Sequence, residues 1–182
     1  RFSKISSIFL ALISGLFAFS FLSRVHGSDF HVAYTWFNMG QKSIQASFWM
    51  NTPAQILVAL VHLVAICVHI FSASYLAHEP NIRRYYTYLH LFLGAMTLLI
   101  LTDQTWIFYG AWELVGACSY LLISFYYEKP SAVSAGKKAF IVTRFADLGF
   151  LIGILTLSYI SGTFSFVELT DPQGSLITQG TT

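Results

Sequence analysis

Residues 107–127 form a run of 21 positions that contains a single charged side chain, Glu113. A bilayer core about 30 Å thick requires about 20 apolar residues in helical form, so this run is long enough to cross it. Glu113 would then lie about two turns from one end of the helix. A carboxylate at such a depth costs something like 2.5–3.5 kcal/mol on insertion scales. We therefore expect a membrane helix whose one acid serves a function that depends on protonation or charge.

The positions that share a helix face with Glu113 support this interpretation. They carry small or hydroxyl-bearing side chains: Gly110, Gly116, Ala117, Tyr120 and Ser124. Small residues let a second helix approach closely, and hydroxyl groups can hydrogen-bond across the gap. We expect Glu113 to face protein or an internal cavity. Burial favours its protonated form and a nearby cation favours its ionised form, so a balance of the two would let it load and release a proton.

The whole chain has the composition of a membrane protein, with 55% hydrophobic and only 10% charged residues. A soluble domain carries about 25% charged residues. The apolar runs are continuous and lack the alternation of a transmembrane barrel, so the expected fold is all-α, a polytopic transmembrane helix bundle. The net charge of +2 is too small to indicate nucleic-acid binding. Cys67 and Cys118 lie within apolar runs and are interpreted as buried free thiols.

We predict a single membrane region over residues 1–182. Its expected helices cover, approximately, residues 5–25, 53–77, 84–101, 106–127 and 139–160. Residues 26–52 are expected to form a polar, aromatic-rich connection, and residues 128–138 a polar loop. The chain begins with Arg and ends in a loop-like stretch, so we expect it to be a portion of a longer chain, truncated at both ends.

The distribution of basic residues predicts the orientation of these helices. If residue 1 lies in the cytoplasm, seven of the ten Lys and Arg residues fall on the cytoplasmic side and two on the other, while Arg144 lies within the last helix. This asymmetry follows the positive-inside rule.

Three charged residues of the last predicted helix are candidates for the same site as Glu113. Arg144 and Asp147 are three positions apart, so their side chains can meet. They form either a structural ion pair or part of a buried polar path with Glu113. Lys138 begins this predicted helix and is either a snorkelling interfacial lysine or a member of the site.

Histidines in the second and third predicted helices are the remaining candidates. His62 and His69 are seven positions apart on one face, and His90 lies on the next helix. His69 and His90 could relay protons, could ligate a haem from two helices, or could be hydrogen-bonded packing residues. No zinc-ligand spacing, phosphate-binding glycine loop or nucleophile elbow is visible in the sequence, so we expect neither a metal site nor a cofactor site in this chain.

Three stretches resemble a known family. Residues 112–123, WELVGACSYLLI, are similar to the WE-x-VG-x-CSYLLI signature of the L-type, antiporter-like membrane subunit of bacterial respiratory complex I. Residues 138–147, KAFIVTRFAD, resemble its KAF-x-V-x-R-x-GD stretch, and residues 69–76, HIFSASYL, resemble its H-x-Y-S-x-x-Y-M helix end. The order and spacing of the three stretches also agree.

The resemblance implies a proton-translocating membrane subunit of NADH:quinone oxidoreductase. Glu113 matches the family's key protonatable glutamate, and Lys138, Arg144 and Asp147 match its charged residues on the next helix. The lysine partner of that glutamate is expected on a helix outside this chain. NADH, FMN, iron–sulfur clusters and quinone are expected in partner subunits, so this chain would contain no redox or catalytic centre. The expected location is the bacterial plasma membrane, as a multi-pass protein surrounded by the other subunits.

Departures from the family pattern leave related branches open. Ala146 stands where the family usually has Gly, and His90 where Asn is common. The alternatives are the large subunit of an Mrp-type sodium/proton antiporter, a membrane subunit of an energy-converting hydrogenase, and a carbon-uptake membrane subunit. A haem-binding membrane anchor that uses His69 and His90 is the alternative from a different class.

Overall fold

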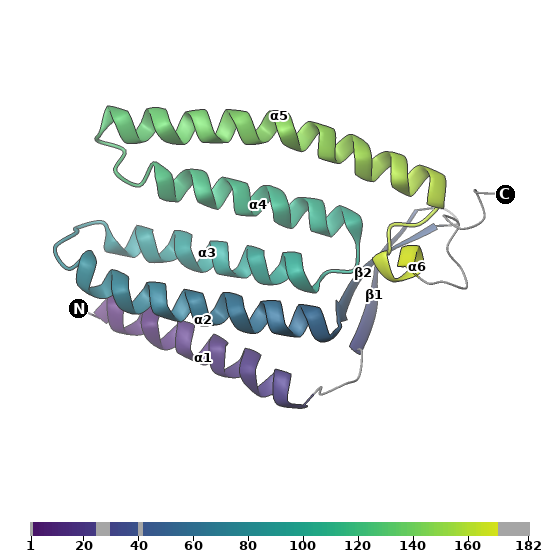
Figure 1. Cartoon of the computed structure of the whole chain (residues 1–182), viewed down its shortest axis with the longest axis horizontal. Coiled ribbons are helices and arrows are strands. Elements are labelled where there is room, and N and C mark those ends of the chain that lie inside the picture. The colour runs from purple at the N-terminus through teal and green to yellow at the C-terminus, as the bar shows by residue number, and fades with distance from the viewer. Residues whose placement is uncertain (1, 25–29, 40–41, 171–182) are drawn as a thin grey trace.

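Five long helices make up most of the computed structural model, which describes residues 2–24, 30–39 and 42–170 (Figure 1). The helices are α1 (Phe2–Arg24), α2 (Thr52–Tyr75), α3 (Ile82–Leu101), α4 (Thr105–Ile123) and α5 (Pro130–Ser161), with a short α6 (Phe166–Thr170). Each of the helices α1 to α5 packs against the next one along the chain, and α1 also contacts α3. This arrangement agrees with the all-α bundle expected from the sequence.

Among the described residues, three helices are long and apolar enough to cross a membrane by themselves: α2, α4 and α5. Leucine, isoleucine and phenylalanine side chains are exposed along α2 and α5, as expected for surfaces that face lipid. α3 has 20 residues, but Arg83, Arg84 and His90 make it more polar. It runs beside α2 and α4 (Figure 1). The topology of five membrane spans therefore stays a prediction. Three of the five helices have the length and composition that a span requires.

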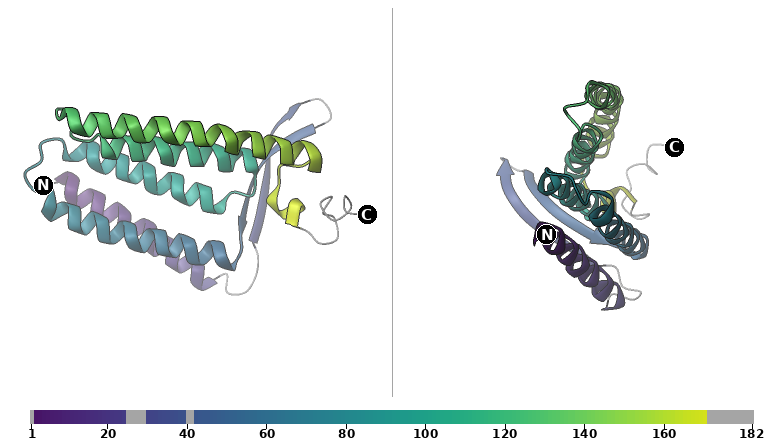
Figure 2. Two further views of the ribbon diagram at one scale, coloured as in Figure 1. Left: turned by 45° about the horizontal axis from the view of Figure 1, so that its top comes forward. Right: turned by 90° about the vertical axis from the view of Figure 1, so that its left-hand side faces the viewer.

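The connection expected over residues 26–52 contains a β-hairpin that the sequence interpretation did not anticipate. Strands β1 (Phe30–Met39) and β2 (Lys42–Met50) pair antiparallel, with an irregularity between Thr35 and Phe37. The signal was present as an alternation, since Val32, Tyr34 and Trp36 occupy every second position and are all exposed. Trp36 stacks on Trp106 at the start of α4, with ring centroids 5.2 Å apart. Figure 2 shows the hairpin lying across one end of the helix bundle.

The predicted boundaries of the last two long helices were wrong by several residues. α5 begins at Pro130, nine residues before the predicted start at 139, so residues 130–138 are helical and not a loop. Proline suits the first helical turn because its missing N–H has no partner there in any case. α4 ends at Ile123 and not near Tyr127. With 32 residues α5 is about 48 Å long, so its first turns extend beyond a hydrocarbon core of about 30 Å.

The helix connections alternate between the two ends of the bundle. The α2–α3 and α4–α5 connections lie at the same end as the start of α1, and the hairpin and α6 lie at the other end (Figure 1). The segments that carry most of the basic residues therefore lie at one end of the bundle, as the orientation predicted from the sequence requires. Residue 1 and residues 171–182, on which the expected truncation at both ends was based, lie outside the described residues.

A single carboxylate, Asp103, joins three segments at the hairpin end. It is 1% exposed and lies in the α3–α4 connection. Its Oδ2 accepts hydrogen bonds from the hydroxyls of Ser47 in β2 (2.9 Å) and Ser165 before α6 (2.7 Å). His31 Nε2 of β1 lies 3.3 Å from the same oxygen, and the backbone N–H of Val167 donates to Oδ1 at 2.8 Å. One side chain therefore connects the hairpin, the α3–α4 connection and α6.

Burial alone would raise the pKa of Asp103, but the hydrogen bonds from Ser165, Val167, Ser47 and His31 favour the ionised form and hold the pKa below its usual value. Because the folded pKa is lower than the unfolded one, the carboxylate stabilises the fold above the unfolded pKa of about 3.9. That contribution is lost as the pH falls through the folded pKa.

Replacing Asp103 by Asn should lower the free energy of unfolding by about 3 kcal/mol, because hydrogen bonds to a charged group are worth about 1.5–3 kcal/mol each. The measurement is the thermal unfolding midpoint of the full-length protein at pH 7 and at pH values below 4. The wild type should lose stability toward acid and the variant should lose less. Glu168→Gln, a change at an exposed carboxylate nearby, is the control. Equal midpoints for Asp103→Asn and the control at pH 7 would contradict the role of Asp103.

The expected topology predicts opposite accessibility for the two ends of the bundle. In a background lacking Cys67 and Cys118, a cysteine at Val32 should react with an impermeant thiol reagent added from outside. A cysteine at His78, which is exposed in the α2–α3 connection, should react only after the membrane is opened. The reverse labelling pattern would show that the orientation is inverted.

Candidate functional site

Glu113 lies where α4 contacts α5, and it forms an ion pair with Arg144. Arg144 Nη1 pairs with Glu113 Oε2, and Arg144 Nη2 donates a 3.1 Å hydrogen bond to the backbone carbonyl of Glu113. The two side chains are 24% and 27% exposed, so water is only partly excluded from the pair. The sequence predicted that Glu113 would face protein, and the structure identifies Arg144 as the group it faces.

Asp147 is the second carboxylate beside Arg144. Its Oδ2 lies 3.8 Å from Arg144 Nη1, and its Oδ1 accepts a 2.8 Å hydrogen bond from the indole N–H of Trp112. Asp147 is 6% exposed, and it lies one helical turn from Arg144 on α5. The predicted contact between Arg144 and Asp147 is therefore present. The same Arg144 guanidinium also pairs with Glu113. The sequence analysis offered a structural ion pair or a polar path with Glu113. In the structure Arg144 contacts both Asp147 and Glu113, so the geometry is compatible with either role.

Trp112 was not recognised as a site residue from the sequence. An indole N–H within an apolar helix requires an acceptor, and the residue directly precedes Glu113, so a polar partner on the neighbouring helix could have been expected. Its hydrogen bond holds Asp147 from the α4 side, while Arg144 holds it from α5. The carboxylate of Asp147 therefore has two partners on two helices.

Small and aromatic residues shape the space around Arg144. Its guanidinium lies 4.6 Å from the centroid of the Phe140 ring. A Cβ atom on Gly116 would come within 3.4 Å of Arg144 Nη2, so the missing side chain leaves room for the guanidinium. Farther along the interface, a Cβ on Gly136 would lie 2.9 Å from Ser124 Cβ. Gly116 on the Glu113 face and Gly136 on α5 thus permit a close helix approach, whereas a Cβ on Gly110 would meet nothing within 4 Å.

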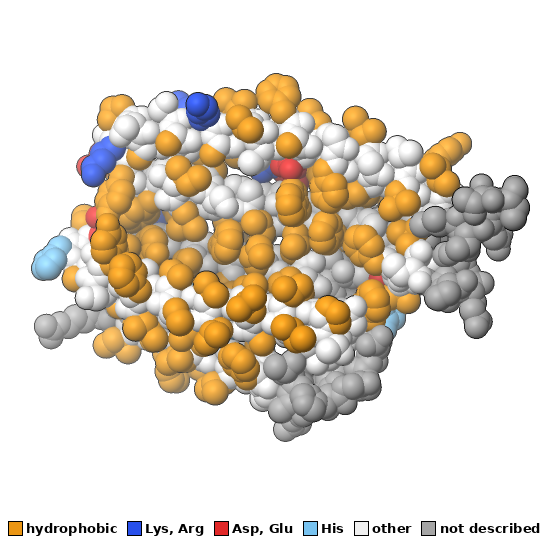
Figure 3. Space-filling model, in the orientation of Figure 1, with side chains coloured by type: hydrophobic (Ala, Val, Ile, Leu, Met, Phe, Trp, Pro, Cys, Tyr) orange, Lys and Arg blue, Asp and Glu red, His pale blue; other side chains and the backbone are white. Residues whose placement is uncertain are grey.

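The Glu113–Arg144 pair borders a hollow of about 350 Å³. Its lining consists of Tyr109, Glu113, Arg144, Phe145 and Leu148. Figure 3 shows acidic and basic side chains together over α4 and α5, within an otherwise hydrophobic face. Arg144 Nε is buried and has no hydrogen-bond partner among the described residues. Glu113 borders this hollow, whereas Asp147 does not line it.

Lys138 does not join this cluster. It lies six residues before Arg144, about 9 Å along α5. Its side chain is exposed and makes no ion pair with another residue in the described part of the chain. It is also within α5 and not at its start. The structure brings together Glu113, Arg144 and Asp147. Lys138 lies apart from them, nearer the end of the bundle where the connection joins α4 to α5.

The candidate relay histidines form a second, separate polar cluster among α1, α2 and α3. His69 is fully buried, and its Nδ1–H donates to the carbonyl of Ala65 at 2.7 Å. Its Nε2 is then an acceptor, and it has no partner among the described residues. The His90 ring centroid lies 4.7 Å away, and His90 Nε2 lies 2.8 Å from the hydroxyl of Ser7. His62 and His90 both line an open groove of about 540 Å³.

This geometry does not suit the haem alternative. Two axial imidazoles approach the iron from opposite faces of the macrocycle, so a porphyrin must lie between the rings. The rings of His69 and His90 are at contact distance, 4.7 Å between centroids, which leaves no space for one. Among the described residues, no group of three or more His, Cys, Asp and Glu side chains has an arrangement that could hold a metal ion.

Comparison with known proteins relates this arrangement to one group of membrane proteins. Residues 102–180 match the family model described as "NADH:quinone oxidoreductase/Mrp antiporter, TM". Residues 36–86 match the model described as "NADH-Ubiquinone oxidoreductase (complex I), chain 5 N-terminus". The two matched regions include β2 and the last residues of β1, the histidines of α2, and the whole of the α4–α5 site.

Curated relatives are similar over most of this chain. The chloroplastic NAD(P)H-quinone oxidoreductase subunit 5 of Angiopteris evecta is 38% identical over 179 residues, which is 97% of this chain and 23% of the relative. Subunit 5 of the organellar chromatophore of Paulinella chromatophora is 38% identical over 82% of this chain and 22% of its own length. NADH-quinone oxidoreductase subunit L of Mycobacterium tuberculosis is 38% identical over 73% of this chain and 21% of its own length. The chain thus spans less than a quarter of the length of these relatives.

Two solved structures share the fold. One is the Mrp complex from Dietzia sp. DQ12-45-1b, with a TM-score of 0.80 and 23% identity over 93% of this chain and 18% of that chain. The other is the membrane-bound sulfane sulfur reductase, an archaeal respiratory membrane complex, with a TM-score of 0.75 and 18% identity over 89% of this chain and 33% of that chain. At these identities the likeness concerns the fold alone.

The shared guanidinium predicts coupled effects of substitution at Arg144 and Asp147. Arg144→Ala leaves two carboxylates without a cation and Asp147→Ala leaves an indole N–H without an acceptor, so each should reduce assembly of the full-length protein. The double variant should be less damaged than the sum of the two, with a coupling of about 0.5–3 kcal/mol. The measurement is the unfolding midpoint and the amount of assembled complex on a native gel.

A control pair tests whether this coupling is specific. Lys137 is exposed on α5 and lies about 15 Å along the helix from Asp147, so Lys137→Ala and Asp147→Ala should be additive. Additive effects for Arg144 and Asp147 as well would contradict direct coupling between them.

Proposed function

The chain belongs to the family of antiporter-like membrane subunits that NADH:quinone oxidoreductases share with Mrp antiporters, and from this membership we propose that it carries a proton-loading site at Glu113. The proposed whole protein is the proton-translocating L-type subunit of an NADH:quinone oxidoreductase. The names of the curated relatives favour this branch, since they are quinone oxidoreductase subunits at 36–38% identity. The likeness to the Mrp complex is at 23% identity and supports the fold.

One observation carries the proposal: a single guanidinium lies between two carboxylates at a helix interface within a membrane protein. When all three groups are ionised, the cluster of Glu113, Arg144 and Asp147 carries one uncompensated negative charge. An unpaired charge away from water is unfavourable by several kcal/mol. The cluster can lower this free energy by binding a proton or by receiving a further cation.

The surroundings of the two acids favour Glu113 as the group that takes the proton. Asp147 is buried, accepts a hydrogen bond from the Trp112 indole N–H and lies 3.8 Å from Arg144. Glu113 has Arg144 as its charged partner and borders the hollow. When a proton binds Glu113, its attraction to Arg144 weakens and the guanidinium can turn fully to Asp147. When a cation approaches through the hollow, the ionised form of Glu113 is favoured again and the proton leaves.

The energies involved are sufficient to drive such a cycle. Moving one elementary charge across 100 mV is worth about 2.3 kcal/mol. Gain or loss of a close ion pair in a partly buried site changes the free energy of protonation by a comparable amount. In the proposed complex the energy comes from redox reactions in partner subunits, which would hold NADH, FMN, iron–sulfur clusters and quinone. The approaching cation would be a lysine on a helix outside this chain, as the family resemblance implies.

We assign His69 and His90 a role as a proton relay, supported by the unpartnered Nε2 of His69 and by the ring contact between them. Lys138 would act as an exposed positive charge near the connection from α4 to α5, where protons would enter, and not as a partner of Glu113.

The protein is a multi-pass membrane protein, and we propose a bacterial plasma membrane as its location. The relative from Mycobacterium tuberculosis supports this location, and the relatives named for chloroplasts make a plastid membrane the competing location.

The second candidate function is the large subunit of an Mrp-type antiporter, because the description of the matched family names both NADH:quinone oxidoreductase and Mrp antiporter. The two functions differ in their partners. Co-purification of NADH-binding and iron–sulfur proteins would identify the oxidoreductase, and co-purification of Mrp subunits would identify the antiporter.

Glu113→Gln keeps the size of the side chain but cannot ionise. In the full-length protein within its complex, we expect this variant to assemble normally and to lose most proton translocation. Glu113→Asp should keep part of the activity, because the carboxylate survives with a shorter reach. The measurement is a dye-quench proton gradient in vesicles, normalised to complex abundance on a native gel.

Glu168→Gln, the same substitution at an exposed side chain of α6, is the matched control and should pump at the wild-type rate. A Glu113→Gln complex that pumps as well as this control would end the proposal. Loss of assembly together with loss of pumping would assign Glu113 a structural role instead.

A further inference from the structure

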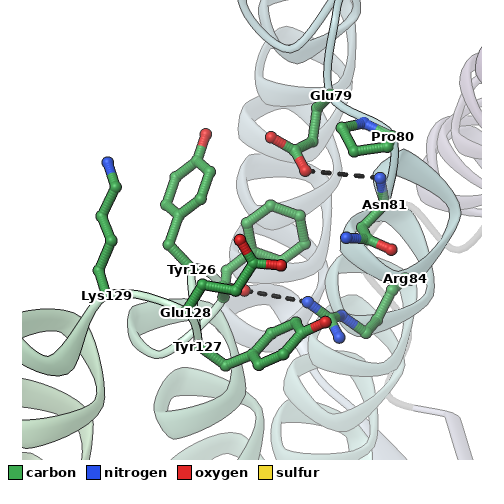
Figure 4. Close-up of a pocket in the computed structure, with 9 residues that line it drawn as sticks. Glu79, Pro80, Asn81, Arg84, Tyr126, Tyr127, Glu128 and Lys129 are labelled. Carbon is green, nitrogen blue, oxygen red and sulfur yellow. Dashed lines mark hydrogen bonds between the residues drawn. The ribbon is translucent and has the colours of Figure 1, made fainter.

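A pocket of about 270 Å³ lies at the opposite end of the bundle from the hairpin, between the α2–α3 connection and the residues that join α4 to α5 (Figure 4). Its lining residues are Glu79, Pro80, Asn81, Arg84, Phe125, Tyr126, Tyr127, Glu128 and Lys129. Its volume is slightly below the roughly 300–1,000 Å³ typical of pockets for drug-sized ligands, which suits a small polar group.

The walls of this pocket carry two cations and two carboxylates that do not neutralise one another. Arg84 and Lys129 provide the positive charges, and Glu79 and Glu128 the negative ones. Within the described part of the chain, none of these four side chains forms an ion pair. A ligand that carries both a negative and a positive group would satisfy all four charges at once.

Arg84 is pre-positioned to bind an anion. Its guanidinium lies 4.5 Å from the Tyr127 ring centroid and 5.3 Å from that of Phe125, and one Nη donates to the carbonyl of Phe125 at 3.0 Å. A guanidinium has five N–H donors, and no other hydrogen bond joins this side chain to a described residue. The remaining donors on a rigidly held guanidinium suit a phosphate oxygen.

The base of the pocket is rigid. Leu76, Ile82 and Tyr86 form a buried hydrophobic cluster beneath the α2–α3 turn, and Tyr85 packs on it. Tyr85 also meets Phe125 edge to face, with ring centroids 5.6 Å apart. The chain segments that carry Glu79, Arg84 and the tyrosines are therefore held in place before any ligand arrives.

The position of the pocket determines which ligands can reach it. It lies where α3 begins and α4 ends, at the level at which spanning helices leave the hydrocarbon core. Tyr126 and Tyr127 are exposed there, as aromatic residues at a membrane interface commonly are. Ile123, in the last turn of α4, is also exposed and extends the apolar surface toward the membrane. A lipid could thus place its headgroup in the pocket and its acyl chains along the helices.

We propose that this pocket binds the headgroup of a zwitterionic membrane phospholipid of the phosphoethanolamine type. Its phosphate would lie against Arg84, and its ammonium would donate hydrogen bonds to the carboxylates of Glu79 and Glu128. Lys129, whose ammonium lies 4.9 Å from the Tyr126 ring centroid, would add a positive charge farther along the pocket wall. A purely anionic headgroup would satisfy the cations but would bring its charge close to the two carboxylates. The proposal concerns lipid binding and does not depend on proton transport by Glu113.

The first test compares lipid retention by two arginine variants. The full-length protein in its complex is reconstituted in vesicles of equal parts phosphatidylethanolamine and phosphatidylglycerol, extracted with detergent, and analysed by native mass spectrometry. Arg84→Gln should retain about tenfold less phosphatidylethanolamine than the wild type, the effect of losing one strong charge-assisted hydrogen bond. Arg83→Gln, the same change at an exposed neighbour that does not line the pocket, should retain as much as the wild type. Equal retention by both variants would overturn the proposal.

A second measurement keeps the proposal testable if Arg84→Gln fails to assemble. A photo-crosslinking amino acid at Tyr127 of the wild-type complex should form an adduct whose mass corresponds to phosphatidylethanolamine. An adduct with phosphatidylglycerol, an adduct with a protein, or no adduct would each contradict the assignment.

Discussion

The guanidinium of Arg144 is the interaction on which the contact between α4 and α5 depends. It pairs with Glu113 on one helix and approaches Asp147 on its own helix, while Trp112 reaches back from α4 to Asp147. The result is a closed set of polar contacts in a surface that is otherwise apolar. Because one positive charge serves two carboxylates, the cluster is held together but not neutralised. The same arrangement therefore stabilises the interface and is the basis of the proton-loading site that we propose at Glu113.

The polar groups at the two ends of the bundle differ in a way that indicates different roles. At the hairpin end, the donors around Asp103 are directed at one carboxylate from three segments, and the group is nearly inaccessible. Such a satisfied cluster fixes the fold. At the opposite end, the charges of Arg84 and Glu128 border an open pocket without pairing. Such an unsatisfied set of charges is suited to a ligand.

The two buried polar clusters within the bundle occupy different helix interfaces. Glu113 and Arg144 lie between α4 and α5, whereas His69 and His90 lie between α2 and α3, with Ser7 from α1. α3 packs against α4, so the helix that carries His90 is also a neighbour of the helix that carries Glu113. Each cluster borders its own hollow. These two clusters are the ones to which we assign the proposed proton-loading site and the proposed relay.

Hydropathy and helical spacing were sufficient to predict the bundle, the position of Glu113 within its helix and the proximity of Arg144 to Asp147. These features depend on the geometry of a single helix, which local sequence determines. The hairpin, the contacts of Asp103, the hydrogen bond from Trp112 and the separation of Lys138 from Glu113 could not be obtained in this way. They depend on how one element is rotated and shifted against another, and that is decided by the packing of residues distant in sequence. Gly116 is an example of both. Its position three residues after Glu113 indicated a close helix contact, but only the tertiary structure showed that Arg144 occupies the space beside it.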